Sequence, residues 1–281
     1  GYTGAMVTML LGLAVQSPPA DWKASVALKS QEAAVAFQSN EDVLPLMAFK
    51  VSGLTDQPET KNHFYSKRNE QRKTTFFNLL TGVYHPTAGA LFFEDRCLND
   101  LKPFQISRLG IARTFQNIRL FSDLTVLDNV LIATHYQMKG SLFDAVRNTR
   151  AYRREEEEHR ESARELLKIF GLLKDESELA KTLSYGDQRR LEIVRALATA
   201  TRLHLLDEPA AGMNKAEKNH LMSLIRLVHQ KYRIAILLIE HDMGVVMNLC
   251  PRVVVLDYGE VIAEGTPDEI RRDPKVIEAY L

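Results

Sequence analysis

The chain has 281 residues, 45% of them apolar, so it can bury a sizeable core and is not composed like a disordered protein. Lysine plus arginine and aspartate plus glutamate balance at 36 each, for a formal net charge of +0. This balance argues against nucleic acid as a partner, because a nucleic-acid binder carries a basic field. The two cysteines, Cys97 and Cys250, lie far apart in no metal-ligand pattern and are expected to be reduced thiols of a cytosolic protein.

The first 72 residues carry few clear signals. The longest apolar run, Ala5 to Val15, is about half of the ~20 residues that a membrane-spanning helix needs. We interpret it as a short helix or a disordered end, with a secretory signal as the alternative, although no basic residue precedes it. Lys23 to Phe37 is compatible with an amphipathic helix, and Phe49 to Thr55 with a strand. Asp56 to Gln71 is polar and has no clear period.

The middle of the chain alternates short strands, turns and helices. Ala90 to Phe93 predicts a strand, Asp95 to Asn99 a turn, and Ile106 to Leu109 a short helix. Thr125 is a candidate cap for the helix that follows it. Gly140 to Leu173 is helical in pattern and highly charged, with a run from Arg153 to Arg160 that we interpret as a solvated face with i,i+4 ion pairs.

Two stretches in the second half carry the chemistry. Leu183-Ser184-Tyr185-Gly186-Asp187-Gln188 precedes a basic helix, whose N-terminal N–H groups and dipole suit an anionic phosphate. Leu203 to Leu206 is a short apolar run that ends in Asp207 and Glu208, which is typical of a buried parallel strand delivering acids to a sheet edge. Ile234 to Ile239 predicts a further strand, and Val253 to Pro267 a strand, a turn and another strand before a short helix from Pro267.

Together these stretches resemble the signature motif and the Walker B strand of the ATP-binding cassette (ABC) ATPases, and Ile239-Glu240-His241-Asp242 fits the same family. The resemblance runs from about Lys73 to Leu281. It is greatest to the ATP-binding subunits of branched-chain amino acid importers. It implies an α/β fold, a P-loop NTPase-like nucleotide-binding domain over residues 49–281, with an inserted helical subdomain at about 117–196. Residues 1–48 resemble no family and form an atypical N-terminal segment.

The resemblance assigns catalytic and metal-binding roles residue by residue. Glu208 is expected to be the general base that polarises the attacking water, and His241 the switch histidine that orients the γ-phosphate and that water. Gln116, in Gly110-Ile111-Ala112-Arg113-Thr114-Phe115-Gln116, is expected to sense the γ-phosphate and Mg²⁺. Asp207 is expected to hold Mg²⁺ directly or through water, together with Thr74.

It also assigns the nucleotide-binding residues. Lys73 is expected to reach the β- and γ-phosphates, with Thr74 and Thr75 beside it at the start of a helix. Ser184, Gly186 and Gln188 are expected to contact the γ-phosphate of an ATP held by another subunit. Ala211-Gly212-Met213-Asn214 matches the D-loop, which lies along the seam of such a dimer.

The phosphate loop, residues 67–75, departs from the family pattern. Lys67 and Arg72 stand at the glycine positions of Gly-x-x-x-x-Gly-Lys-[Ser/Thr], and Glu70 stands where cassettes carry an extra glycine. Glycine is used there because the backbone must adopt positive φ and approach the phosphates closely. Left-handed geometry costs an L-residue roughly 1–2 kcal/mol, so three such positions predict ATP binding weaker by roughly two to four powers of ten.

The function that the resemblance implies is the ATP-binding and hydrolysing subunit of an ABC importer, with ATP and Mg²⁺ as cofactors. Expected partners are a second ATPase subunit, identical or a sister, two membrane permeases, and indirectly a periplasmic or extracellular substrate-binding protein. Its expected place is the cytoplasmic face of the membrane, bound through the permeases. Nucleic acid is not an expected partner.

Three alternatives remain open at this point. The altered loop is compatible with a cassette-shaped interaction subunit that does not hydrolyse ATP. The abrupt start of the resemblance at Lys73 is compatible with a damaged reading frame that joins unrelated sequence to a cassette fragment. A related ABC exporter ATPase is the alternative within the transporter class, and only the helical insertion argues against it.

Overall fold

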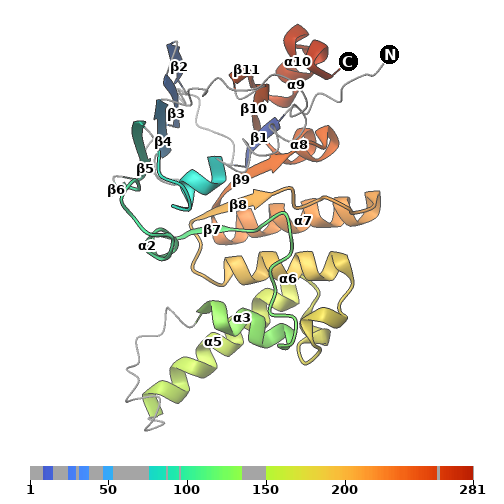
Figure 1. The fold of residues 1–281 in the computed structure, drawn as a ribbon. Coiled ribbons are helices and arrows are strands. Elements are labelled where there is room, and N and C mark those ends of the chain that lie inside the picture. The colour runs from blue at the N-terminus through green and yellow to red at the C-terminus, as the bar shows by residue number, and fades with distance from the viewer. Residues whose placement is uncertain are drawn as a thin grey trace, which may run out of the picture.

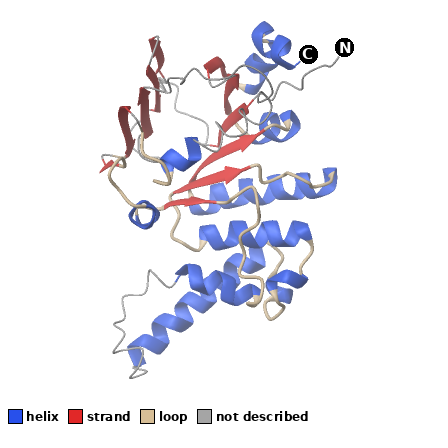
Figure 2. Ribbon diagram, viewed as in Figure 1, coloured by secondary structure: helices blue, strands red, loops and turns tan. Residues whose placement is uncertain are grey.

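The computed structural model describes residues 9–14, 25–29, 32–37, 47–52, 76–86, 88–94, 96–134, 150–257 and 260–280. They form two sheets with helices packed in layers on one side, and the chain ends in two short helices beside the larger sheet (Figure 1). Figure 2 shows the predominantly helical half of the molecule below the strands.

The larger sheet has six strands in the order β11-β10-β1-β9-β8-β7. Strands β7, β8 and β9 run parallel to one another. Strand β1 is antiparallel to both of its neighbours, with Gly12 opposite Leu238 of β9 and opposite Val253 of β10. The strand bounds are β1 Met9–Ala14, β7 Ile111–Arg113, β8 Leu203–Asp207, β9 Ala235–Glu240, β10 Arg252–Asp257 and β11 Glu260–Gly265.

The smaller sheet is antiparallel throughout, in the order β2-β3-β4-β5-β6. Its strands are β2 Ser25–Lys29, β3 Glu32–Phe37, β4 Met47–Ser52, β5 Ala88–Phe93 and β6 Arg96–Cys97. The strand expected at 90–93 is therefore confirmed, and so is the described part, residues 49–52, of the strand expected at 49–55. The stretch expected to be only a turn, 95–99, contributes a two-residue strand, since Arg96 pairs with Phe93 across the ladder.

The helices have the following bounds: α2 Pro103–Arg108, α3 Val126–Thr134, α5 Arg150–Ile169, α6 Tyr185–Leu197, α7 Lys215–Tyr232, α8 Met243–Leu249, α9 Pro267–Arg272 and α10 Pro274–Tyr280, with 3-10 turns at Leu173–Asp175 and Ala180–Thr182. A helical segment also covers residues 76–80. In Figure 1, α7 lies beside the strands, α6 follows, and α3 and α5 lie furthest from the sheet.

Local signals placed several of these helices correctly. The Asp128 N–H donates to Thr125 Oγ1 at 3.1 Å, which confirms the expected cap of α3. On α5, Arg154 pairs with Glu158 and Arg160 with Glu156, which confirms an exposed face with i,i+4 pairs. The first ten residues of the charged stretch, 140–149, lie outside the described residues.

Two expectations for the N-terminal segment are wrong. The apolar run Ala5 to Val15 contains a strand, β1, rather than a short helix, because its backbone pairs on both sides inside the large sheet. Lys23 to Phe37 contains two antiparallel strands, β2 and β3, rather than a helix. β3 pairs in turn with β4, the next strand along the chain, so hydrogen bonds between strands outweigh the helical period of the sequence.

The core consists of two apolar clusters on opposite faces of the large sheet. One joins α3, α5, α6 and α7 to the sheet and includes Phe170, Leu191 and Leu206. The other lies toward the smaller sheet and includes Phe77, Leu91 and Leu205. Alternate residues of β8 enter the two clusters, so this strand is buried on both faces.

His204 is a polar residue at the centre of this core. It is 1% exposed, and its Nε2 has no hydrogen-bond partner among the residues that the structure describes. Burial lowers the pKa of His204 to about 3, because a charged imidazolium is disfavoured in an apolar environment. The side chain is therefore neutral at pH 7.

His204 makes the fold sensitive to acid. In the folded protein the pKa of His204 lies below the ordinary 6.5. The part of the unfolding free energy that depends on a neutral His204 is therefore fully present above pH 6.5 and is lost as the pH falls toward 3. Between pH 6.5 and 4, we expect the parent to lose about 3 kcal/mol of unfolding free energy more than the His204→Leu variant does. Urea unfolding at several pH values measures this difference. His220→Gln, at an exposed position of α7, is the control, and parallel pH profiles for parent and His204→Leu contradict the prediction.

Candidate active site

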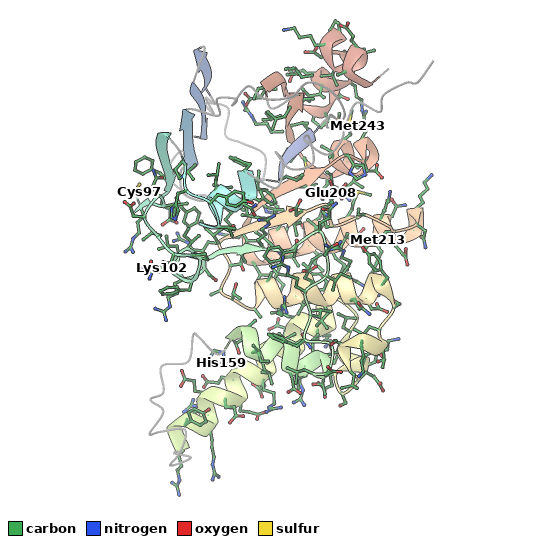
Figure 3. The ribbon with its side chains drawn as sticks, viewed as in Figure 1. Cys97, Lys102, His159, Glu208, Met213 and Met243 are labelled. Carbon is green, nitrogen blue, oxygen red and sulfur yellow. The ribbon has the colours of Figure 1, made fainter. Side chains whose placement is uncertain are left out.

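The site is built at the carboxyl end of β8. All five residues of this strand, Leu203–Asp207, are buried, and the next residue is Glu208. The Glu208 N–H donates to the carbonyl of Ile239 at 2.9 Å, which ties it to the end of β9. Glu208 has φ of 46°, a left-handed conformation that L-residues rarely adopt and that is found at functional sites. In Figure 3, Glu208 lies between Met213, just before α7, and Met243, at the start of α8.

Two predicted site residues contact the carboxylate of Glu208. Gln116 Nε2 donates to Glu208 Oε2 at 3.0 Å, and His241 Nδ1 lies 3.4 Å from Glu208 Oε1. The Glu208 side chain is 10% exposed and that of His241 54%, so the carboxylate is mostly shielded while the imidazole faces solvent. Three residues from distant parts of the sequence thus meet at one carboxylate.

Asp207 contacts an arginine to which the sequence analysis gave no role. Arg113 NH2 donates to Asp207 Oδ2 at 2.7 Å, and Arg113 NH1 donates to Asn78 Oδ1 at 2.7 Å. The two charged side chains are 4% and 6% exposed, and the guanidinium lies over the rings of Phe77 and Phe115. One feature of the sequence could have indicated that Arg113 belongs to the site. It stands three residues before Gln116, on a strand that leads to the sheet edge.

The residue just before the predicted D-loop is held by Glu240, which precedes His241. The Ala210 N–H donates to Glu240 Oε1 at 2.9 Å, and burial raises the pKa of the Glu240 carboxyl. Gly212 has φ of +74°, and a Cβ there would lie 3.4 Å from the Tyr185 ring. Glycine therefore allows this loop to approach the start of α6 without strain.

The predicted signature residues lie at the start of α6. Ser184 is its N-cap: the Asp187 N–H donates to Ser184 Oγ at 3.2 Å, and Ser184 Oγ donates to Asp187 Oδ2 at 2.7 Å. Gln188 Nε2 donates to the carbonyl of Leu183 at 3.0 Å. A Cβ on Gly186 would lie 3.4 Å from Glu217 Oε1, next to the start of α7. These contacts are local to α6 and its neighbourhood and do not join the carboxylate of Glu208.

The remaining predicted residues lie outside the described part of the chain. These are Lys73, Thr74 and Thr75, so their roles at the phosphates and at Mg²⁺ stay predictions. The Asp207 carboxylate and the Gln116 amide at the sheet edge carry the hard oxygen atoms that Mg²⁺ prefers, so they are compatible with their predicted role toward this ion. Arg113 already donates to one Asp207 oxygen.

Comparison with known families shows to which family the chain belongs. A family model described as ABC transporter matches residues 71–211, and one described as branched-chain amino acid ATP-binding cassette transporter matches residues 260–281. The chain belongs to the ABC transporter ATPase family. This confirms the resemblance noted in the sequence and the P-loop NTPase class of the fold.

Individual ABC relatives agree with the family models. The chain is 46% identical over 213 residues to the high-affinity branched-chain amino acid transport ATP-binding protein LivG of Salmonella typhimurium, covering 76% of this chain and 84% of LivG. BraF of Pseudomonas aeruginosa, described in the same words, is 42% identical with the same coverage. A crystal structure of a nucleotide-free ATP-binding cassette from an ABC transporter is 28% identical, with a TM-score of 0.60 over 74% of this chain and 83% of that one.

The described helices of this ABC cassette include none that is long and apolar enough to cross a membrane. Both cysteines are free, Cys97 at the surface and Cys250 buried. Burial raises the pKa of the Cys250 thiol to about 12, so it is not a reactive thiolate at pH 7.

Proposed function

We propose that this chain is the ATP-binding and ATP-hydrolysing subunit of an importer for branched-chain amino acids. The observation that carries the proposal is the Glu208 carboxylate, held between Gln116 and His241 at the end of a buried parallel strand. The LivG and BraF relatives supply the substrate class, since both are described as branched-chain amino acid transport proteins.

The proposed chemistry is attack of a water on the γ-phosphorus of ATP, which breaks the bond to the β–γ bridging oxygen and releases ADP and inorganic phosphate. Glu208 accepts a proton from that water, Gln116 fixes the carboxylate from one side, and His241 is exposed enough to reach the phosphate. Asp207 and Gln116 would hold Mg²⁺, which would supply positive charge to neutralise the phosphates. Ser184, Gly186 and Gln188 contact the γ-phosphate held by a second subunit, which makes the working form a two-fold dimer.

The proposed assembly adds two permeases and, indirectly, a substrate-binding protein outside the membrane, with this chain at the cytoplasmic face. Closure of the dimer on ATP moves the permeases, and hydrolysis resets them. We propose further that the cassette covers residues 49–281, with its helical subdomain at about 117–196. The helices α3, α5 and α6 pack against one another, which supports a helical subdomain in this part of the chain.

A second candidate function is an interaction subunit that keeps the cassette shape without hydrolysis. The specific observation in its favour is the sequence of the phosphate loop, where Lys67, Glu70 and Arg72 replace the glycines of the family pattern. The two candidate functions differ in two measurable properties, the binding of ATP and its turnover.

The experiment that tests the first proposal is ATP hydrolysis by the chain reconstituted with its two permeases in vesicles. We expect Mg²⁺-dependent hydrolysis that rises severalfold, roughly fivefold or more, when binding protein loaded with leucine, isoleucine or valine is added, because substrate shifts the transporter toward the closed dimer. Binding protein loaded with an acidic amino acid is the control. Absence of hydrolysis with intact assembly supports the interaction subunit instead.

A further inference from the structure

The inner face of α6 carries a buried ion pair that the proposed chemistry does not use. Arg189 and Glu192 lie one helical turn apart, and both side chains are 2% exposed. Arg189 NH1 donates to Glu192 Oε2 at 3.1 Å. Burying two charges is costly unless their remaining donors and acceptors are also satisfied, so their further partners are informative.

Those partners are four backbone groups of one short segment, residues 115–119. Arg189 donates from NH1 to the carbonyl of Phe115 at 2.5 Å and from NH2 to the carbonyl of Gln116. Glu192 Oε1 accepts from the N–H of Phe115 at 3.4 Å and from the N–H of Arg119 at 3.3 Å. The pair thus binds both carbonyl and amide groups of a segment that has no regular secondary structure.

Residues 115–119 need hydrogen bonds from side chains, because their backbone is paired neither within the sheet nor within a helix. Its last sheet-like hydrogen bond is from the Thr114 N–H to the carbonyl of Leu205 at 3.0 Å. From Phe115 onward the backbone leaves β7, and the Arg119 guanidinium lies 4.2 Å from the centre of the Phe115 ring. Gln116 belongs to this segment, and its Nε2 contacts Glu208. Whether Nε2 reaches the Glu208 carboxylate therefore depends on the position of the backbone of residues 115–119.

We propose that the buried Arg189–Glu192 pair is a positioning device. It fixes the backbone of residues 115–119 on α6, so that Gln116 Nε2 reaches the carboxylate of Glu208. The same helix begins at Ser184, so the pair joins the signature end of α6 to the proposed general base. Neither residue touches the reacting atoms, and their effect on hydrolysis passes through Gln116. The kinetic part of this inference rests on the proposed function, whereas the structural part does not.

The test uses the full chain and the double variant Arg189→Met with Glu192→Leu. Apolar residues of similar volume commonly replace a buried ion pair without loss of stability, so this variant separates positioning from folding. Removing only one partner, as in Arg189→Met, leaves a buried charge and is expected to lower the melting temperature by about 10 °C. We expect the double variant to recover most of that loss.

Hydrogen exchange of individual amides gives the first readout, and it needs no ATP. In the double variant we expect the Phe115 and Arg119 amides to exchange at least about tenfold faster, because their acceptor is gone. The Thr114 amide, which donates to Leu205, is the internal reference and keeps its rate. The matched control is Arg164→Met with Glu176→Leu, which removes an ion pair between α5 and the following loop and leaves residues 115–119 unaffected.

Steady-state kinetics give the second readout. We expect kcat to fall about 100-fold while KM for ATP changes by less than about threefold, since a misplaced Gln116 alters the transition state rather than nucleotide binding. Unchanged exchange at residues 115 and 119 overturns the proposal, as does faster exchange with unchanged kcat. A parent that hydrolyses no ATP counts against the proposed function, while the exchange rates still decide whether the pair positions the segment.

Discussion

Rebuilding the phosphate loop with Lys67→Gly, Glu70→Gly and Arg72→Gly is expected to tighten ATP binding by roughly two to four powers of ten. The chain belongs to a family whose loop cradles phosphates with backbone N–H groups, and that cradle needs residues that accept positive φ. Replacing three L-residues by glycine removes roughly 1–2 kcal/mol of strain at each position. Removing the Glu70 carboxylate also removes repulsion from the phosphates.

Calorimetric titration of parent and rebuilt chain with Mg²⁺ and a non-hydrolysable ATP analogue measures the difference. A matched control replaces Lys102, Lys174 and Lys215, three exposed lysines outside residues 67–75, by glycine or alanine, and is expected to leave affinity within about threefold. If parent and rebuilt chain bind within about tenfold of each other, the strain argument is wrong and the parent is a working subunit with an unusual loop. If only the rebuilt chain binds, the parent is an inactive cassette.

Glu208→Gln is expected to lower the rate of ATP hydrolysis by about 100- to 10,000-fold while leaving ATP binding intact. Glutamine has the shape of glutamate, and its amide oxygen can still accept from Gln116 Nε2, so the local geometry is preserved. What is lost is the carboxylate that accepts a proton from the attacking water. The effect should therefore appear in kcat and not in the dissociation constant for ATP.

This variant is best made both in the parent chain and in the chain with the rebuilt phosphate loop, so that weak nucleotide binding does not conceal a loss of turnover. Single-turnover hydrolysis at saturating ATP isolates the chemical step. Glu178→Gln, at an exposed glutamate between the two 3-10 turns, is the control and is expected to hydrolyse ATP at the parent rate. Hydrolysis by Glu208→Gln at more than about a tenth of the parent rate removes Glu208 from the role of general base.

The two experiments together distinguish the working ATPase from the interaction subunit. An intact Glu208, Gln116 and His241 cluster predicts that repair of the loop alone restores turnover, because the chemistry at the end of β8 is already assembled. If the rebuilt chain binds ATP tightly and still fails to hydrolyse it, the defect lies in the cluster of Glu208, Gln116 and His241. In that case the Arg189–Glu192 pair and the segment it holds are the next positions to examine.

The sequence alone determined the elements whose signals are local. The strand expected before the two acids ends at Asp207, because a short apolar run followed by Asp207 and Glu208 is typical of a parallel strand covered on both faces. Thr125 caps α3 as expected, since a hydroxyl that accepts from an N–H three residues later is a local interaction. The family's motif order also predicted that Gln116, Glu208 and His241 would act together.

Only the tertiary structure decided the contacts that join distant segments. Arg113 and Asp207 are 94 positions apart, and no sequence period indicates that a guanidinium on β7 would lie against the acid of β8. The run Ala5 to Val15 was predicted as a helix or a disordered end, yet β1 lies between β9 and β10. An apolar run of this length is compatible with helix or strand, and the choice depends on whether unpaired strand edges elsewhere in the fold can accept its backbone hydrogen bonds.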